Sequence, residues 1–166
     1  MRRSRRTALP VRRAAGAVAG AWLLSLLGAA AADADESNFC SQLSIVVAEQ
    51  TNKFHRLRSE RFDNQLESFE TDLLLPGFET CRIDAISPGY FCLKGGLTNE
   101  AGDELAGELV QRVHSCYPHV HADQAMDTAS PVPRQVTDWT FENGTHIRIV
   151  RRTYRDHLGS VFIYVR

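Results

Sequence analysis

The first 32 residues of the chain contain no acidic side chain. They begin with a basic head of six arginines, continue as an uncharged run over residues 14–32, and end in small residues. A basic head, a short apolar core and a small-residue end are the three parts of a secretory signal peptide. We therefore expect residues 1–32 to be a cleaved export signal and residues 36–166 to form a single domain.

Two questions about the export signal stay open at this point. The uncharged run has about the ~20 residues that a membrane-spanning helix needs, so an uncleaved anchor is the alternative to cleavage. Its many alanines and glycines gain little from hydrocarbon, which favours cleavage. The Ser-Arg-Arg sequence at residues 4–6 also resembles a twin-arginine signal, the alternative to general secretion. Either route leads to a periplasmic or extracellular protein.

Lysine is scarce, since Lys53 and Lys94 are the only two in the chain. Together with the abundant alanine, this composition is typical of bacteria with GC-rich genomes. Removal of residues 1–32 leaves 13 basic and 20 acidic residues, a formal net charge of −7. An acidic domain is poorly suited to nucleic acids or anionic membranes, so we expect neither as a partner after signal cleavage.

The common catalytic motifs are also absent. The sequence has no G-x-S-x-G nucleophile elbow, no phosphate-binding loop and no H-E-x-x-H zinc motif. It has no C-x-x-C pair, which excludes a thioredoxin-type motif and a paired-cysteine zinc site. We therefore lean against an enzyme and expect no cofactor.

The four cysteines all lie in the exported part of the chain. An even number of cysteines in an oxidising compartment predicts two disulfides and no free thiol. Three pairings are open. We favour Cys40–Cys116 with Cys81–Cys92, for reasons that depend on the expected fold.

Apolar spacing predicts a first helix over residues 38–61, capped by Ser37 or Asn38. Alternation over residues 80–86, turn residues, and an apolar run over residues 90–94 that Gly95-Gly96 ends predict a β-hairpin. A second helix begins at a cap, Thr98 or Asn99, and ends before Pro118.

Three strands are expected near the end of the chain, over residues 135–141, 145–154 and 160–166. Residues 119–134 are interpreted as a linker, and residues 61–71 as a loop, an irregular turn or an edge strand. The Asn143-Gly144 pair predicts a turn. A three-residue loop there sets Trp139 opposite Ile147 and keeps the apolar side chains on one sheet face.

These elements predict an α+β fold, with two helices packed on one face of an antiparallel sheet of about five strands, in the order α-ββ-α-βββ and stapled by disulfides. Antiparallel helices would bring Cys40, near the start of the first, to Cys116 at the end of the second. Cys81 and Cys92 would lie on paired strands.

One strand of this sheet carries a candidate binding face. His146, Arg148, Arg152 and Tyr154 point the same way from an extended segment. Arginine beside an aromatic ring suits a carboxylate or phosphate, so the expected partner is a protein or a small anionic ligand. The alternative is a solvated sheet face whose arginines pair with nearby acids.

A second candidate site follows the second helix, where His114, His119 and His121 lie within eight residues of one another. Imidazoles this close suit Zn or Cu, although no fourth ligand is specified. The alternative is a polar helix end. The sequence thus predicts a small exported binding module without a recognisable catalytic site, with a metal-binding protein or metal-dependent enzyme as the second hypothesis.

Overall fold

The computed structural model describes residues 24–128, 132, 134–154 and 158–166. The chain divides into two units, Met1–Asp33 and Ala34–Arg166, and the arrangement below is that of the second unit. The predicted signal peptide lies largely outside the described residues. Its cleavage therefore stays a prediction.

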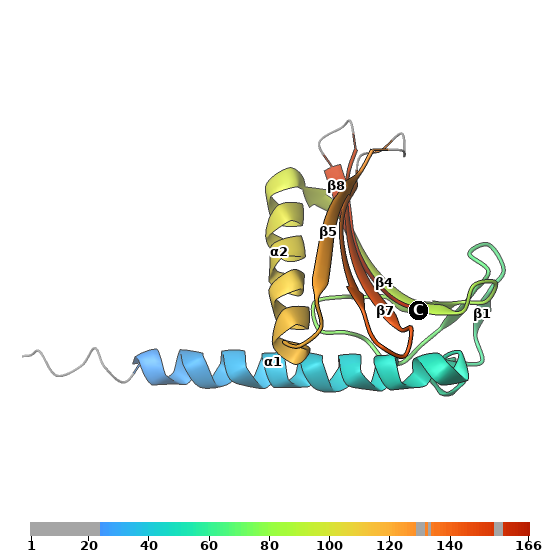
Figure 1. The fold of residues 1–166 in the computed structure, drawn as a ribbon, viewed down its shortest axis with the longest axis horizontal. Coiled ribbons are helices and arrows are strands. Elements are labelled where there is room, and N and C mark those ends of the chain that lie inside the picture. Colours follow the sequence, from blue (N-terminus) through green and yellow to red (C-terminus); the bar gives the residue numbers. More distant parts are fainter. Residues whose placement is uncertain (1–23, 129–131, 133, 155–157) are drawn as a thin grey trace, which may run out of the picture. The chain divides into compact units, whose positions relative to one another are not determined.

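The described residues form one eight-stranded antiparallel sheet and two α-helices (Figure 1). The helices are α1 (Leu24–Glu49) and α2 (Asn99–Cys116), and two short 3-10 helices, η1 (Gln50–Asn52) and η2 (His55–Leu57), follow α1. The strands are β1 (Phe62–Asp63), β2 (Ser68–Glu70), β3 (Cys81–Asp84), β4 (Gly89–Thr98), β5 (Ala122–Asp127), β6 (Arg134–Thr140), β7 (His146–Thr153) and β8 (Leu158–Val165). In the sheet their order is β1-β2-β3-β4-β8-β7-β6-β5, so that β4 and β8 join two four-stranded meanders.

The expected sheet of about five strands is therefore wrong in strand number and order, although the fold is α+β. Two of the additional strands, β1 and β2, have only two and three residues, too few to show an alternating pattern. The third, β5, lies in the segment interpreted as a linker. It is an edge strand with exposed residues on both faces, so it carries no apolar alternation.

The first helix is also misplaced in the prediction, because α1 begins at Leu24 and ends at Glu49 instead of spanning residues 38–61. Lys53 and Phe54 both have left-handed backbone conformations, with φ of 53° and 59°. Non-glycine residues seldom adopt this conformation, so the sequence gives no helix-stop signal there. The chain instead turns through η1 and η2, and the Phe54 ring is fully buried.

The second helix begins as predicted at a capping threonine. Thr98 Oγ1 accepts a hydrogen bond of 3.3 Å from the backbone N–H of Ala101. The strand before it continues through Gly95-Gly96, where the sequence predicts its end. The pairing of β4 with β8 shifts register between Lys94 and Leu97, and Gly96 has a φ of +69°. The two glycines thus form an irregularity within the strand.

The turn between β6 and β7 confirms the predicted register. Trp139 lies opposite Ile147, and Phe141 and Thr145 are joined by a 2.9 Å backbone hydrogen bond across a three-residue loop. Gly144 has a φ of +82°, the left-handed conformation that this loop needs. The register puts Trp139 and Ile147 together in the core, both fully buried.

One face of the sheet, called the inner face here, packs against both helices. It contributes Ile147, Ile149 and Ile163 to a single core, which α1 enters with Phe39, Leu43 and Val46 and α2 with Ala106, Leu109 and Val113. The expected antiparallel helix pair is wrong: α2 stands across the direction of α1, and only its C-terminal end meets α1 (Figure 1). That end carries Cys116, which forms a disulfide with Cys40.

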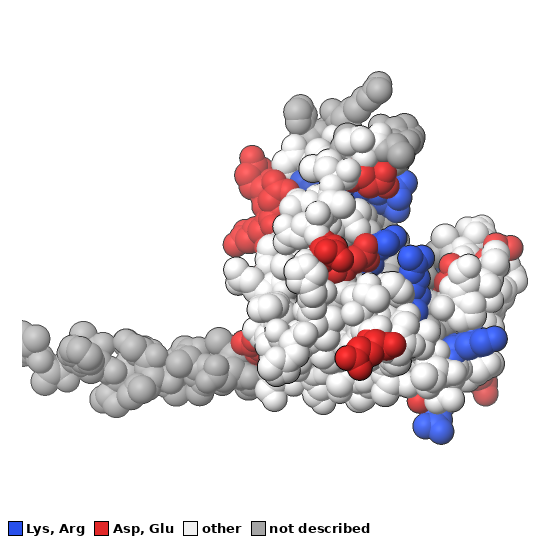
Figure 2. Space-filling model, viewed as in Figure 1, with Lys and Arg blue, Asp and Glu red and all other residues white. Residues whose placement is uncertain are grey.

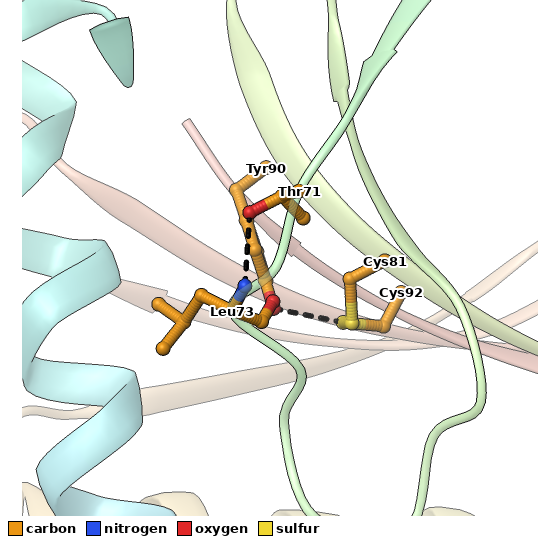
Figure 3. Close-up of a disulfide and its surroundings, with 5 residues drawn as sticks. All are labelled: Thr71, Leu73, Cys81, Tyr90 and Cys92. Carbon is orange, nitrogen blue, oxygen red and sulfur yellow. Dashed lines mark hydrogen bonds between the residues drawn. A yellow bond between two sulfur atoms is a disulfide. The ribbon is translucent and has the colours of Figure 1, made fainter. Parts of the chain in front are cut away.

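The second disulfide joins Cys81 and Cys92, which face each other on β3 and β4. Both pairs are those that the sequence favoured. Figure 3 shows how the segment after β2 lies against this bridge. The Tyr90 hydroxyl donates a 2.8 Å hydrogen bond to the Leu73 carbonyl and lies 3.3 Å from Cys92 Sγ. Tyr90 thereby ties the segment after β2, which contains Leu73, to the sheet.

Candidate functional site

The opposite face of the sheet, called the outer face here, is the candidate site. On β7 it carries His146, Arg148, Val150 and Arg152, because alternate residues of a strand point to opposite faces. The strands bend away from the helices, so that this face is concave (Figure 1). The helices do not cover it.

Three neighbouring strands build a recess on the outer face. It has a volume of about 140 Å³ and is lined by Arg134, Arg148, Val150, Arg152, Tyr164 and Arg166. The register brings these side chains together, since Arg134 lies opposite Arg152 and Arg148 opposite Tyr164. The lining residues thus include four guanidinium groups and no acidic side chain. We call this site the arginine recess.

Surface charge is divided between the two sides of the molecule. Lys and Arg side chains border the concave side, whereas acidic side chains gather over α2 (Figure 2). Opposite charges within about 10 Å attract at moderate ionic strength, and more distant ones are largely screened. The acidic side chains over α2 therefore do not cancel the local charge of the arginine recess, although Asp138, which pairs with Arg148, and Asp127, which lies opposite Arg134, offset part of it.

Arg148 is already committed to an acidic neighbour. Its Nε and Nη2 atoms donate hydrogen bonds of 2.7 and 2.8 Å to the two carboxylate oxygens of Asp138. This hydrogen bonding raises the pKa of Arg148 above its usual value. Arg148 therefore forms a structural ion pair on the sheet face, the alternative to a binding role that the sequence left open. It is less available than Arg152 to bind an external anion.

Arg152 lies in a different environment. Its guanidinium sits 4.4 Å from the centre of the Phe162 ring, and its Nε is buried without a hydrogen-bond partner among the described residues. Phe162 in turn stacks on Tyr164, with ring centres 5.7 Å apart. The ring faces hold the cation in place without neutralising it. Arg152 is thus the arginine best prepared to receive an external anion.

The other two predicted face residues are only partly included. Tyr154 is 40% exposed and follows Arg152 on the same face. The neighbouring Ser160 hydroxyl lowers the pKa of Tyr154, and the Arg152 guanidinium lowers it further. His146 lies at the far end of β7, where its Nδ1 is 3.1 Å from Thr140 Oγ1, and it does not line the recess.

Sequence reasoning missed three residues of the recess: Arg134, Tyr164 and Arg166. Arg134 lay in the segment taken as a linker. Tyr164 and Arg166 lay on an expected strand, but nothing along the chain connects them to Arg152. The pairing of β7 with β6 and β8 was the missing signal.

The histidine candidates lie around a separate surface recess beyond α2, lined by His114, His119 and His121 with three neighbouring residues. Across the described part of the chain, no group of three or more His, Cys, Asp or Glu side chains is placed to hold a metal ion. Cys116 is bonded to Cys40, and His121 lies 3.4 Å from Asp123 with both side chains exposed. The geometry gives the metal hypothesis no support.

Comparison with known proteins adds no relative: no family model, no curated protein and no solved structure matches the chain. None of the helices within the described residues has the length and apolar character needed to cross a membrane.

Proposed function

We propose that this protein is a small exported binding module that captures an anionic ligand in the arginine recess, without catalysing a reaction. The observation that carries the proposal is Arg152, a partly buried guanidinium on an aromatic ring, for which the described residues supply no ion-pair partner and whose Nε has no hydrogen-bond partner among them. Arg134 and Arg166 flank it within the same recess.

Guanidinium groups bind carboxylates and phosphates through paired, charge-assisted hydrogen bonds. Several of them around one recess attract an anion more strongly than one alone, and the stacked rings below exclude water from one side. The concave face also limits the approach of large surfaces. A small anion, or the charged end of a larger molecule, therefore suits the site.

The two disulfides are consistent with an oxidising, exported environment. We further propose that residues 1–32 are the cleaved signal that delivers the domain there. Binding would then take place in the periplasm or outside the cell, where no nucleic acid or cytoplasmic cofactor competes for the recess.

The test is a titration of the purified protein with inorganic phosphate at low salt, followed by NMR shifts of backbone amides. We expect saturable shifts on β6, β7 and β8. Arg152→Gln should weaken phosphate binding about tenfold, the usual effect of losing one charge-assisted hydrogen bond. Arg61→Gln is the matched control, since Arg61 is exposed, pairs with Glu70 and lies outside the recess.

If Arg152→Gln and Arg61→Gln weaken phosphate binding equally, the effect is due to net charge alone, which would contradict the proposal. The absence of saturable shifts in the wild-type protein would also contradict it. Melting temperatures of the variants, measured alongside, establish that each is folded.

A further inference from the structure

We infer that the anion bound in the arginine recess is the head of an amphiphile with an acyl chain, and that the chain lies in an adjoining apolar groove. The inference rests on the proposed function, because it uses the same recess for the charged head. It adds the class of the ligand and the path of its tail.

The groove lies on the outer face where β4 and β8 run together, with a volume of about 330 Å³. It is lined by Leu93, Gly95, Gly96, Tyr154, Leu158, Gly159, Ser160 and Phe162, none of which carries a formal charge at neutral pH. Leu93 and Leu158 are 41% and 44% exposed, large fractions for leucine side chains on a sheet face. We call this site the apolar groove.

Two glycines widen the apolar groove on the β4 side. A Cβ atom at Gly95 or Gly96 would meet no other atom within 4 Å, so both positions border open space. The register shift between Lys94 and Leu97 places them there. The groove is therefore a consequence of the strand irregularity that the Gly-Gly pair produces.

The apolar groove adjoins the arginine recess at Phe162, a groove residue that contacts Arg152 and Tyr164 of the recess. Its ring lines the groove, carries the Arg152 guanidinium at 4.4 Å and stacks on Tyr164 of the recess. Alternate residues of β8 follow the same path, from Tyr164 in the recess to Leu158 in the groove. Arg152 lies opposite Ser160 with its guanidinium over the Phe162 ring, so the part of this path that is left for the acyl chain runs from Phe162 to Leu158, about 13 Å at ~3.3 Å per residue.

The position of the site in the sheet argues for an amphiphile over a peptide. The site lies on β4, β8 and β7, the central strands, whose backbone groups bond to neighbouring strands. An extended peptide gains affinity by adding main-chain hydrogen bonds at a sheet edge, and none are offered here. An acyl chain has no polar backbone to satisfy. It needs only the apolar side chains and the cation that this face provides.

The experiment compares binding of dodecanoate and acetate, two carboxylates that differ in the apolar chain, by isothermal titration of the protein purified after export. We expect dodecanoate to bind at least about tenfold more tightly than acetate, because burial of each methylene is favourable. The double variant Leu93→Ser/Leu158→Ser should weaken dodecanoate binding about fivefold and leave phosphate binding unchanged. Leu66→Ser/Ile86→Ser is the matched control, since both side chains are exposed outside the groove.

The outcomes separate this inference from the proposed function. Equal binding of dodecanoate and acetate, with phosphate binding still lost in Arg152→Gln, overturns the inference and leaves anion capture intact. If the binding of every anion tested is independent of Arg152, both the inference and the proposed function are overturned. Tighter binding of an acidic leucine-containing peptide than of dodecanoate, lost in the groove variant, replaces the amphiphile with a protein partner and overturns the inference.

Discussion

At the scale of single residues, the inner face holds one unusual side chain, Arg151, which is 3% exposed. Its guanidinium donates to the carboxylate of Asp103 at 3.1 Å, to the Asn99 carbonyl at 3.0 Å, and to Thr153 Oγ1 at 2.8 Å. Arg151 thereby ties the first turn of α2 to β7. A buried cation is tolerated because its donors are satisfied and one partner is charged.

The same guanidinium explains why α2 contains Gly102. A Cβ atom at Gly102 would lie 2.6 Å from Arg151 Nε, whereas one at Gly107 would meet nothing within 4 Å. Both substitutions to alanine gain about 1 kcal/mol of helix propensity. We predict that Gly107→Ala stabilises the protein by up to about 1 kcal/mol. Gly102→Ala should destabilise it by about 1–2 kcal/mol, because Arg151 must leave its hydrogen bonds.

Chemical denaturation of the two alanine variants measures this difference on one helix. Gly102→Ala as stable as Gly107→Ala would show that Arg151 moves aside at no cost.

The candidate site shows the limit of sequence reasoning at this scale. Arg148 and Arg152 could be assigned to one face, because alternation along a strand is local information. Which of them is paired could not be assigned, since Asp138 and Phe162 lie on other strands. The distinction that matters for function, a neutralised Arg148 beside an available Arg152, depends on register.

At the scale of elements, strong local signals predicted the structure well. The capped second helix, the hairpin containing Cys81 and Cys92, and the Asn143-Gly144 turn are all present. The missed strand β5 lies at an edge, where pairing with β6 holds it and no apolar pattern marks it. The end of α1 was missed because the exposed Lys53 and the buried Phe54 both take left-handed conformations, which non-glycine residues do not signal in the sequence.

The disulfides connect elements over different distances and should contribute unequally to stability. Cys40–Cys116 spans 76 residues and Cys81–Cys92 spans 11. In the loop-entropy model these closures contribute about 4.5 and about 2.8 kcal/mol. We therefore predict that replacing Cys40 and Cys116 with alanine lowers the free energy of unfolding about 2 kcal/mol more than replacing Cys81 and Cys92.

Alanine is used for both pairs because serine would bury a hydroxyl at Cys81 and Cys92, which are 3% and 0% exposed. Denaturant unfolding under non-reducing conditions measures both variants. A larger loss of unfolding free energy on replacement of Cys81 and Cys92 would show that the packing of this disulfide against Tyr90 outweighs loop entropy.

At the scale of the whole molecule, the helices and the outer face divide two tasks. The helices bury the inner face and acidic side chains gather over α2, while the outer face stays open and Lys and Arg side chains border it (Figures 1 and 2). A sheet covered on one side only is free to present the other to a ligand. The fold therefore accommodates a cationic site within an acidic domain.

The composition also governs how the whole fold responds to alkali. The chain has four tyrosines and only two lysines, so tyrosines dominate its titration above neutral pH. Burial raises the pKa of Tyr90, Tyr117 and Tyr164 above the usual value, whereas the pKa of Tyr154 is lowered. Three of the four thus resist ionisation in the folded state.

Stability should therefore fall as the pH rises above about 10, the pKa of tyrosine in the unfolded chain. Below that pH the hydroxyls are neutral in both states, and above it the unfolded state loses protons that the folded state retains. Tyr90 alone should cost about 1 kcal/mol between pH 10 and pH 11, and the slope approaches about 1.4 kcal/mol per pH unit above that range. Tyr90→Phe should lose about 1 kcal/mol of stability at pH 8, because its hydrogen bond to Leu73 is removed, and its stability should decline less steeply between pH 10 and 11.

Denaturant unfolding at each pH measures this, with Tyr154→Phe as the control. A decline equally steep in Tyr90→Phe and wild type would show that Tyr90 ionises without unfolding the protein.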